Sequence, residues 1–370
     1  MKYIKGFDTI RAYAVILVII SHWGPDFSSK SALGFLKEIL IPNGIFGVFL
    51  FFVLSGFLIT LILLHEKLKM NEGKSLNIVK NFYIRRFLRI FPIYYLVILL
   101  CYLLNMAYVK PYLGYFVCYA SNYIPLKFMY NSPLAHTWSL SIEEQFYIIW
   151  PWIIIFIDLK YLKYILIGTI LLGSLAYLKV IYGGGENVLS YFSAFGFGAL
   201  YAYMRLDKDR CARFENAFKI IFPILLFIAW QMRAYAGLPV CVMFSSILNE
   251  LIGLALIMFM LNNKYVWINK YIMENRVLNY LGKISYGLYL YHYAWGVYYD
   301  FYLKPQLMIH TNLPGFVTGF YFSYLIKSAG LLLISTLSYK YIEQPILRLK
   351  RKFEYAPETI HSSPLLQSHL

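Results

Sequence analysis

The chain has 370 residues, of which 60% are hydrophobic and only 14% are charged. Soluble domains contain about 45–50% apolar and about 25% charged residues, so this composition excludes a soluble enzyme, a disordered chain and a nucleic-acid-binding domain as the main interpretation. Lys and Arg outnumber Asp and Glu by 34 to 18, which gives a net charge of +16. In a membrane protein such an excess indicates basic cytoplasmic loops rather than an anionic partner.

Apolar runs of about 20 residues cross a bilayer as helices, because lipid offers no hydrogen-bond partner to the backbone. The clearest run is Ile45–Leu64, which carries no charge. We expect about ten such helices, embedded among membrane lipids. They lie at Ala12–Trp23, Ile45–Leu64, Ile90–Met106, Gln145–Ile157, Tyr164–Leu178, Val188–Met204, Ile220–Met232, Leu251–Asn263, Ile284–Tyr299 and Leu313–Tyr339.

One further apolar segment, Pro111–Met129, contains Pro, Gly and Lys residues and is ambiguous. If it does not span the membrane, all the basic loops (67–80, 205–219, 264–283 and 348–352) face the cytoplasm, as positively charged loops prefer. The sequence therefore predicts an all-α, multi-pass bundle in the cell (inner) membrane with both termini cytoplasmic. Residues 105–140 become a long external or re-entrant loop.

The domain organisation that follows is simple. Residues 1–347 form one transmembrane domain, and residues 348–370 form a cytoplasmic tail that is basic and then polar. The four cysteines are scattered without paired spacing, so we expect neither a metal site nor a disulfide framework.

Charged residues inside the apolar runs are the sharpest functional signal, because each costs about 2.5–3.5 kcal/mol on insertion scales. Arg11 and His22 lie about three helical turns apart and so share one face of the first helix. Asp8 precedes Arg11 by one turn and is expected to pair with it. The structural alternative is an Arg that reaches to the interface and a His packed near the outer surface.

Two other charged clusters flank later spans. Arg85, Arg86 and Arg89 suit a phosphate-bearing ligand, because guanidinium groups present several donors. On composition alone, a simple cytoplasmic flank explains them better. Glu143 and Glu144 open the fourth helix, either as favourable acidic residues at its N-terminus or with one carboxylate facing His22.

Three single residues, Glu250, His292 and Lys327, lie inside predicted helices. For Glu250 and Lys327 we favour internal ion pairs that hold helices together. His292 could form an internal ion pair of the same kind.

Several stretches, in this order, resemble the membrane-bound acyltransferase family 3, the bacterial O-acyltransferases that modify surface polysaccharides. The most specific one is Trp138-Ser-Leu-Ser-Ile-Glu-Glu-Gln-Phe-Tyr147. The others are 7–12 through His22, 47–59, Arg85-Arg86 with Arg89, 281–292 and Tyr341-Ile-Glu-Gln-Pro345. Together they cover residues 6–352, and Thr9 stands where many relatives have Gly.

The resemblance implies a membrane O-acyltransferase that moves an acyl group, most often acetyl, from cytoplasmic acyl-CoA to a hydroxyl of a cell-surface or lipid-linked glycan. It implies His22 as general base or transient acyl carrier, Glu143 as its orienting or proton-shuttling partner, and Arg11 as a stabiliser of CoA or developing negative charge. Arg85, Arg86 and Arg89 would hold the phosphates of acetyl-CoA. Some family members carry an additional esterase-like domain; this chain is expected to act alone or with a separate polysaccharide-assembly partner.

We expect the acceptor to contact Trp138 and Ser139 within the specific motif. Tyr119 and Tyr123 are candidates for stacking on sugar rings, although simple anchoring at the membrane interface explains them better. Three other functions compete with the acyltransferase: a transporter or flippase, a non-catalytic partner in polysaccharide assembly, and a glycan polymerase. The absence of a visible internal repeat counts modestly against a transporter.

Overall fold

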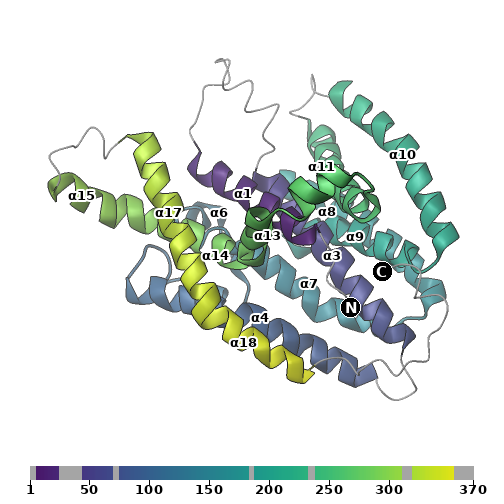
Figure 1. The fold of residues 1–370 in the computed structure, drawn as a ribbon, viewed down its shortest axis with the longest axis horizontal. Coiled ribbons are helices and arrows are strands. Elements are labelled where there is room, and N and C mark those ends of the chain that lie inside the picture. Colours follow the sequence, from purple (N-terminus) through teal and green to yellow (C-terminus); the bar gives the residue numbers. More distant parts are fainter. Residues whose placement is uncertain are drawn as a thin grey trace.

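The structure is a computed structural model that describes residues 6–24, 44–69, 75–182, 187–231, 238–310 and 319–353. Within these ranges every regular element is helical (Figure 1). The longer helices are α1 (Phe7–Trp23), α3 (Gly44–Leu68), α4 (Ser75–Leu103), α7 (Thr137–Phe156), α8 (Leu159–Ile181), α9 (Phe192–Met204), α10 (Lys208–Gln231), α11 (Pro239–Asn262), α13 (Arg276–Lys283), α14 (Ser285–Tyr298) and α17 (Phe320–Ser338).

Each predicted span overlaps a helix, and residue 232 of the seventh span and residues 313–318 of the last one lie outside the described ranges. Five helices in the described part of the chain are long and apolar enough to cross a membrane: α3, α4, residues 159–178 of α8, α11, and residues 322–349 from α17 through α18 (Gln344–Leu349). The all-helical, multi-pass prediction is thus supported.

Helix α3 forms the centre of the bundle, and most of its side chains are buried. Its contact with α9 is very close. A β-carbon on Gly56 would lie 2.1 Å from the carbonyl oxygen of Phe195, and one on Gly198 would lie 2.0 Å from that of Val53. Small residues allow such approach between helices that share no hydrophobic driving force in lipid. A hydrogen bond of 2.7 Å from the Trp150 indole to Thr60 ties α7 to the same helix.

The ambiguous segment 111–129 contains only short turns of helix: α5 (Leu113–Val117), η1 (Ser121–Tyr123) and α6 (Leu126–Met129). None approaches the length of about 20 residues that a bilayer requires. The hydroxyls of Tyr94 and Tyr95 on α4 each donate to a backbone carbonyl of this segment at 2.9 Å. The segment is therefore a loop folded against the bundle, in agreement with the prediction that it does not span the membrane.

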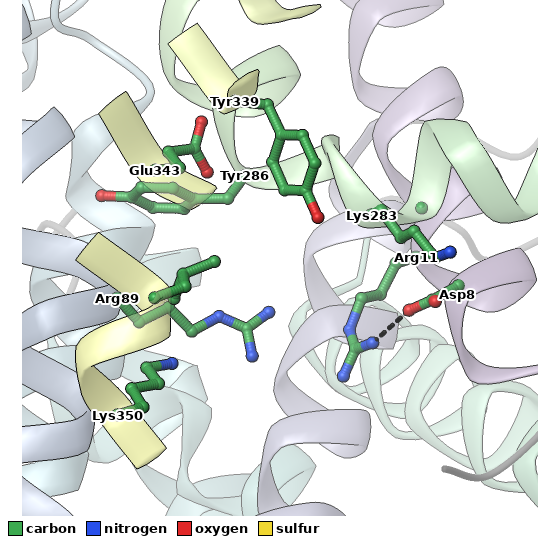
Figure 2. Close-up of a pocket in the computed structure, with 10 residues that line it drawn as sticks. Asp8, Arg11, Arg89, Lys283, Tyr286, Tyr339, Glu343 and Lys350 are labelled. Atoms are coloured by element: carbon green, nitrogen blue, oxygen red, sulfur yellow. Dashed lines mark hydrogen bonds and ion pairs between the residues drawn. The ribbon is translucent and has the colours of Figure 1, made fainter. Parts of the chain in front are cut away.

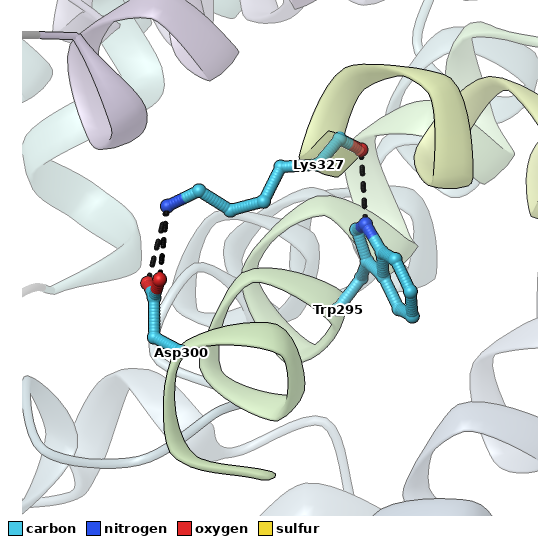
Figure 3. Close-up of polar contacts among 3 residues, drawn as sticks. All are labelled: Trp295, Asp300 and Lys327. Atoms are coloured by element: carbon cyan, nitrogen blue, oxygen red, sulfur yellow. Dashed lines mark hydrogen bonds and ion pairs between the residues drawn. The ribbon is translucent and has the colours of Figure 1, made fainter. Parts of the chain in front are cut away.

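Of the two expected intramembrane ion pairs, one is present. Lys327 on α17 binds Asp300 in η5 (Tyr299–Leu303), with 3.1 Å between Nζ and Oδ2 (Figure 3). The indole of Trp295 donates to the backbone carbonyl of Lys327 at 2.9 Å, which ties α14 to α17 at the same point.

The expectation for Glu250 was wrong in its partner. Its carboxylate is fully buried and accepts a hydrogen bond of 2.7 Å from the Ser193 hydroxyl, rather than pairing with a cation. A hydroxyl from a neighbouring helix is enough to bind one oxygen of a buried carboxyl group without importing a second charge into the bundle.

Candidate active site

A cavity of about 330 Å³ lies between the first turns of α1 and the helical turns at 339–350 (Figure 2). Its lining combines cations, carboxyl groups and two tyrosines from α1, α4, α13, α14 and the C-terminal turns: Asp8, Arg11, Arg89, Gly282, Lys283, Tyr286, Tyr339, Glu343, Leu347 and Lys350. Residues more than 300 positions apart in the sequence thus form one site.

The ion pair predicted within α1 is confirmed at this cavity. The Nη1 atom of Arg11 lies 2.7 Å from Oδ1 of Asp8, one helical turn before it. Asp8 holds the guanidinium at the cavity wall, as Figure 2 shows. Arg89 reaches the cavity from α4, and Figure 2 shows its guanidinium directed across the opening toward Arg11.

Lys350 lies just beyond the last span, in η7 (Lys350–Phe353). Burial, together with the nearby positive charges of Arg89, Arg86 and Arg85, lowers the pKa of Lys350 to about 6. A lysine with this pKa is largely neutral at pH 7, because it cannot add a further positive charge to the cluster at low cost. An anion bound in the cavity would relieve this repulsion.

The predicted arginine cluster divides between different partners. Arg89 lines the cavity. Arg86 lies over the ring of Tyr147, with 4.7 Å between Cζ and the ring centroid. Arg85 donates to the backbone carbonyl of Phe353 at 3.4 Å. Only Arg89 among the three therefore belongs to the described lining of the cavity, and Arg85 and Arg86 extend the positive region around it.

Glu143 is half-buried on α7 and is not part of the cavity lining. Its carboxylate accepts hydrogen bonds from the hydroxyls of Ser55, at 2.5 Å, and Tyr147. In the described part of the chain, no hydrogen bond joins Glu143 to His22. The predicted contact between that carboxylate and the imidazole is thus not among those of the described residues, because Glu143, in the second turn of α7, contacts Ser55 on α3 instead.

His22 lies near the C-terminal end of α1, whereas Asp8 and Arg11 line the cavity near its N-terminal end. Eleven residues separate it from Arg11, which corresponds to about 16 Å along the helix axis. The His22 side chain is exposed, whereas His292 on α14 beside it is fully buried. The Nδ1 atom of His22 lies 3.1 Å from Nε2 of His292. His22 thus has a hydrogen-bonding partner, His292, that sequence spacing alone did not predict.

A third histidine, His136, precedes α7 and packs against His292 with 4.8 Å between ring centroids. Its Nε2 atom lies 3.1 Å from the carbonyl oxygen of Leu290. Burial, and then the nearness of His22, lower the pKa of His136 to about 3, so it is neutral at physiological pH. The loop before α7, the end of α1 and α14 therefore bring three imidazoles together, those of His136, His22 and His292.

The predicted acceptor residues have different surroundings. The hydroxyl of Ser139 lies 2.5 Å from that of Tyr289, so Ser139 is part of the packing around the histidines. The indole of Trp138 packs on Tyr191, with 5.3 Å between centroids. The ring of Tyr119 is 6% exposed and stacks on Tyr94, whereas Tyr123 is 53% exposed. Sugar stacking by Tyr119 is therefore blocked in this structure, because its ring already packs in the interior.

Several residues of the cavity and of the histidine cluster had no role assigned from the sequence. Lys283 and Lys350 belong to basic loops whose charge we used only to set orientation. Glu343 and His292 belong to the two C-terminal motifs of the resemblance, and His292 also lies inside a predicted helix. His136 opens the most specific motif region and was likewise left without a role.

Comparisons with known proteins identify the family of the chain. A family model described as "Acyltransferase domain", that of acyltransferase 3, matches residues 4–328. A Staphylococcus aureus (strain COL) protein provisionally named an O-acetyltransferase is 29% identical to this chain, over 97% of this chain and 61% of its own length. No solved structure matches the chain.

Two further relatives carry names that mention peptidoglycan. The peptidoglycan O-acetyltransferase OatA of Listeria monocytogenes is 27% identical, over 93% of this chain and 56% of its own length. A Bacillus subtilis protein provisionally named a peptidoglycan O-acetyltransferase is 26% identical, over 93% and 55%. The chain spans between half and two thirds of the length of these relatives. Because the family model covers most of the chain, the protein belongs to the acyltransferase 3 family.

Proposed function

We propose that this protein is a multi-pass membrane O-acetyltransferase. It takes an acetyl group from acetyl-CoA on the cytoplasmic side and transfers it to a hydroxyl of a cell-wall glycan on the outer side. One observation carries the proposal: a cation-lined cavity and an exposed histidine lie at opposite ends of the same helix, about 16 Å apart. This arrangement suits a donor that is charged at one end and reactive at the other.

The cavity residues fit the phosphates of the donor. Arg11, Arg89, Lys283 and Lys350 converge there, and guanidinium groups bind phosphate oxygens through paired hydrogen bonds. A volume of about 330 Å³ accommodates a phosphate-bearing part of acetyl-CoA rather than the whole molecule. The extended pantetheine arm would then run between the helices toward the thioester position near His22. Arg85 and Arg86 add positive potential around the entrance.

The chemistry assigned to His22 is proton transfer. Its imidazole removes the proton from the acceptor hydroxyl while the oxygen forms a bond to the thioester carbonyl carbon. Collapse of the tetrahedral intermediate breaks the C–S bond, and the departing thiolate takes the proton from the imidazolium. Exposure of His22 beside a buried partner gives the acceptor access to the base.

Glu143 has a supporting role in this account. Its carboxylate fixes the hydroxyls of Ser55 and Tyr147, and the Arg86 guanidinium lies over the Tyr147 ring. These contacts join α3, α4 and α7 between the cavity and the histidines. We propose that Glu143 maintains this region for the donor arm, and that the contact to His22 comes from His292.

The acceptor class follows from the named relatives. Two of them carry peptidoglycan in their names, so we propose a cell-wall glycan, either polymerised or lipid-linked, as the acceptor. Tyr123 in the external loop remains the candidate for sugar stacking, because its ring is exposed. With the chain in the cell membrane and both termini in the cytoplasm, as we propose, the cavity would lie on the side where acetyl-CoA is present.

Transfer can be tested with membranes that contain the full chain, radiolabelled acetyl-CoA and a panel of glycans including peptidoglycan fragments. We expect label to appear in one glycan as an alkali-labile ester and free CoA to be released in equal amount. Glycan binding or movement across the membrane without acetyl-CoA consumption would instead indicate a transporter or a non-catalytic assembly partner.

A further inference from the structure

We propose that His292 is a positioning residue that fixes the tautomer of His22, so that Nε2 of His22 carries the lone pair used as the base. This inference rests on the proposed function, because it assigns a partner to the same proton acceptor. It is carried by a chain of contacts from the backbone of α14 through His292 to His22.

The first contact sets the protonation of His292. Its Nδ1 atom lies 2.5 Å from the carbonyl oxygen of Tyr289, one turn earlier on α14. A carbonyl oxygen only accepts hydrogen bonds, so Nδ1 of His292 carries the hydrogen. Tautomers are assigned from such networks, because hydrogen positions follow from the partners that each nitrogen has.

The second step uses burial. The side chain of His292 is 0% exposed, and the titratable groups that face it are His22, His136, Tyr289 and Tyr293. Among the residues that the structure describes, these neighbours include neither a carboxylate nor another anion. A buried imidazolium without an anion is costly, so His292 is neutral and its Nε2 atom has a lone pair.

The third step transfers this assignment to His22. Since Nε2 of His292 can only accept, the 3.1 Å contact requires Nδ1 of His22 to donate. A neutral imidazole has one hydrogen, and in His22 it is on Nδ1. The remaining nitrogen, Nε2, therefore carries the lone pair on the exposed side chain, where an acceptor hydroxyl can reach it.

The neighbouring residues hold His292 in place. The neutral His136 ring packs against one side of it. The Tyr289 hydroxyl, bonded to Ser139 at 2.5 Å and to the carbonyl of His136 at 3.1 Å, anchors α14 to the start of α7. His292 thus has the same role toward His22 that a carboxylate has in a serine-hydrolase triad, namely fixing tautomer and orientation.

A neutral residue has an advantage at the buried position of His292. A carboxylate beside His22 would have to be buried as a charge before the reaction, which is expensive inside a membrane protein. The imidazole of His292 costs little in the resting state. When His22 takes the proton from the acceptor, its Nδ1–H bond to His292 becomes a charge-assisted hydrogen bond and stabilises the imidazolium.

The test compares two substitutions in the full chain in membranes. His292→Leu removes the acceptor but keeps a similar volume, whereas His292→Gln places an amide oxygen near the position of Nε2. We expect His292→Leu to lower kcat ~10–100-fold, the range seen when the partner of a functional histidine is removed, with little change in the KM for acetyl-CoA. His292→Gln should recover a substantial part of kcat.

Tyr293→Phe is the matched control, because it keeps the ring beside His22 and removes only a hydroxyl that donates to the Tyr130 carbonyl. It should have near-normal kcat. A His292→Leu variant with normal kcat, or a His292→Gln variant as slow as His292→Leu, would overturn the positioning role.

Two further results separate this inference from the proposed function. If His22→Ala abolishes transfer and His292→Leu does not change it, only the positioning role fails; if His22→Ala also transfers normally, the assignment of the base itself fails. Should either His292 variant not fold, ¹⁵N chemical shifts of the wild-type histidines still decide. We expect a protonated Nδ1 and an unprotonated Nε2 in His22, and the opposite tautomer would contradict the proposal.

Discussion

The backbone of Gly282 packs directly on the backbone of Asp8, so that a β-carbon on Gly282 would lie 1.9 Å from the Asp8 carbonyl oxygen. This contact brings α13 against the first turn of α1 and forms part of the cavity wall. Any side chain at position 282 must push the two helices apart, because both sides of the contact are backbone.

Gly282→Ala should therefore disrupt the cavity and its donor binding. We expect at least a tenfold loss of acetyl-CoA affinity, measured on the purified protein by calorimetry, together with a lower Tm. Gly168→Ala on α8 is the control, since no atom lies within 4 Å of its added β-carbon. That variant should be neutral or slightly stabilised, by up to about 1 kcal/mol. Equal behaviour of the two variants would contradict the packing argument.

Arg89 and Arg85 lie one turn apart on α4 but have different surroundings. Arg89 lines the cavity, whereas Arg85 donates to the Phe353 carbonyl. Hydrogen bonds to charged groups contribute ~1.5–3 kcal/mol, so Arg89→Met should weaken acetyl-CoA binding about tenfold or more. Arg85→Met should have a clearly smaller effect. Titration of both variants with acetyl-CoA checks this, and a larger loss for Arg85→Met would place the phosphates elsewhere.

The lowered pKa of Lys350 predicts that donor binding depends on pH. Its pKa of about 6 means that it is mostly neutral at pH 7 to 8, and a bound phosphate raises that pKa by supplying an opposite charge. Binding is then accompanied by proton uptake, and acetyl-CoA affinity should increase as the pH falls from 8 toward 6. Lys350→Met removes this part of the slope but leaves the titration of the donor itself. Identical slopes in the wild type and the variant would show that Lys350 does not face the phosphates.

Cys118 offers a test of membrane topology with the native chain. It is exposed in the segment 111–129, which we place outside the membrane. A membrane-impermeant maleimide added to intact cells should label Cys118, and Cys118→Ser should lose that label. Cys211 should react slowly even in opened membranes, since burial and then Glu215 raise its pKa to about 11. If Cys118 were labelled only after the membranes are opened, the segment 111–129 would face the cytoplasm and the proposed orientation would be wrong.

The sequence predicts those features that depend on short-range patterns. Apolar runs such as Ile45–Leu64 locate the helices, because lipid admits few other backbone structures. The Asp8–Arg11 ion pair follows from spacing on one helix face. Pro111, Gly114 and Pro125 leave the segment 111–129 ambiguous, and the preference of basic loops for the cytoplasm assigns it to a loop.

Contacts between distant helices could not be predicted in the same way. His22 and His292 are 270 positions apart, and no local pattern indicates that their rings meet. Glu143 is placed by the rotation of α7, which turns its carboxylate toward Ser55. Lys350 looks like an ordinary basic flank, because a charge count does not distinguish a lysine at the surface from one folded into a cavity.

The most direct test of the account measures acetyl transfer and donor binding together in wild type and His22→Ala. Wild-type membranes should transfer label from acetyl-CoA to the glycan, and His22→Ala should reduce transfer to the background rate while its acetyl-CoA Kd stays unchanged. This split is expected because His22 lies about 16 Å along α1 from Arg11, which lines the cavity proposed to bind the phosphates. A folded His22→Ala variant that transfers acetyl groups at the wild-type rate would contradict the central claim.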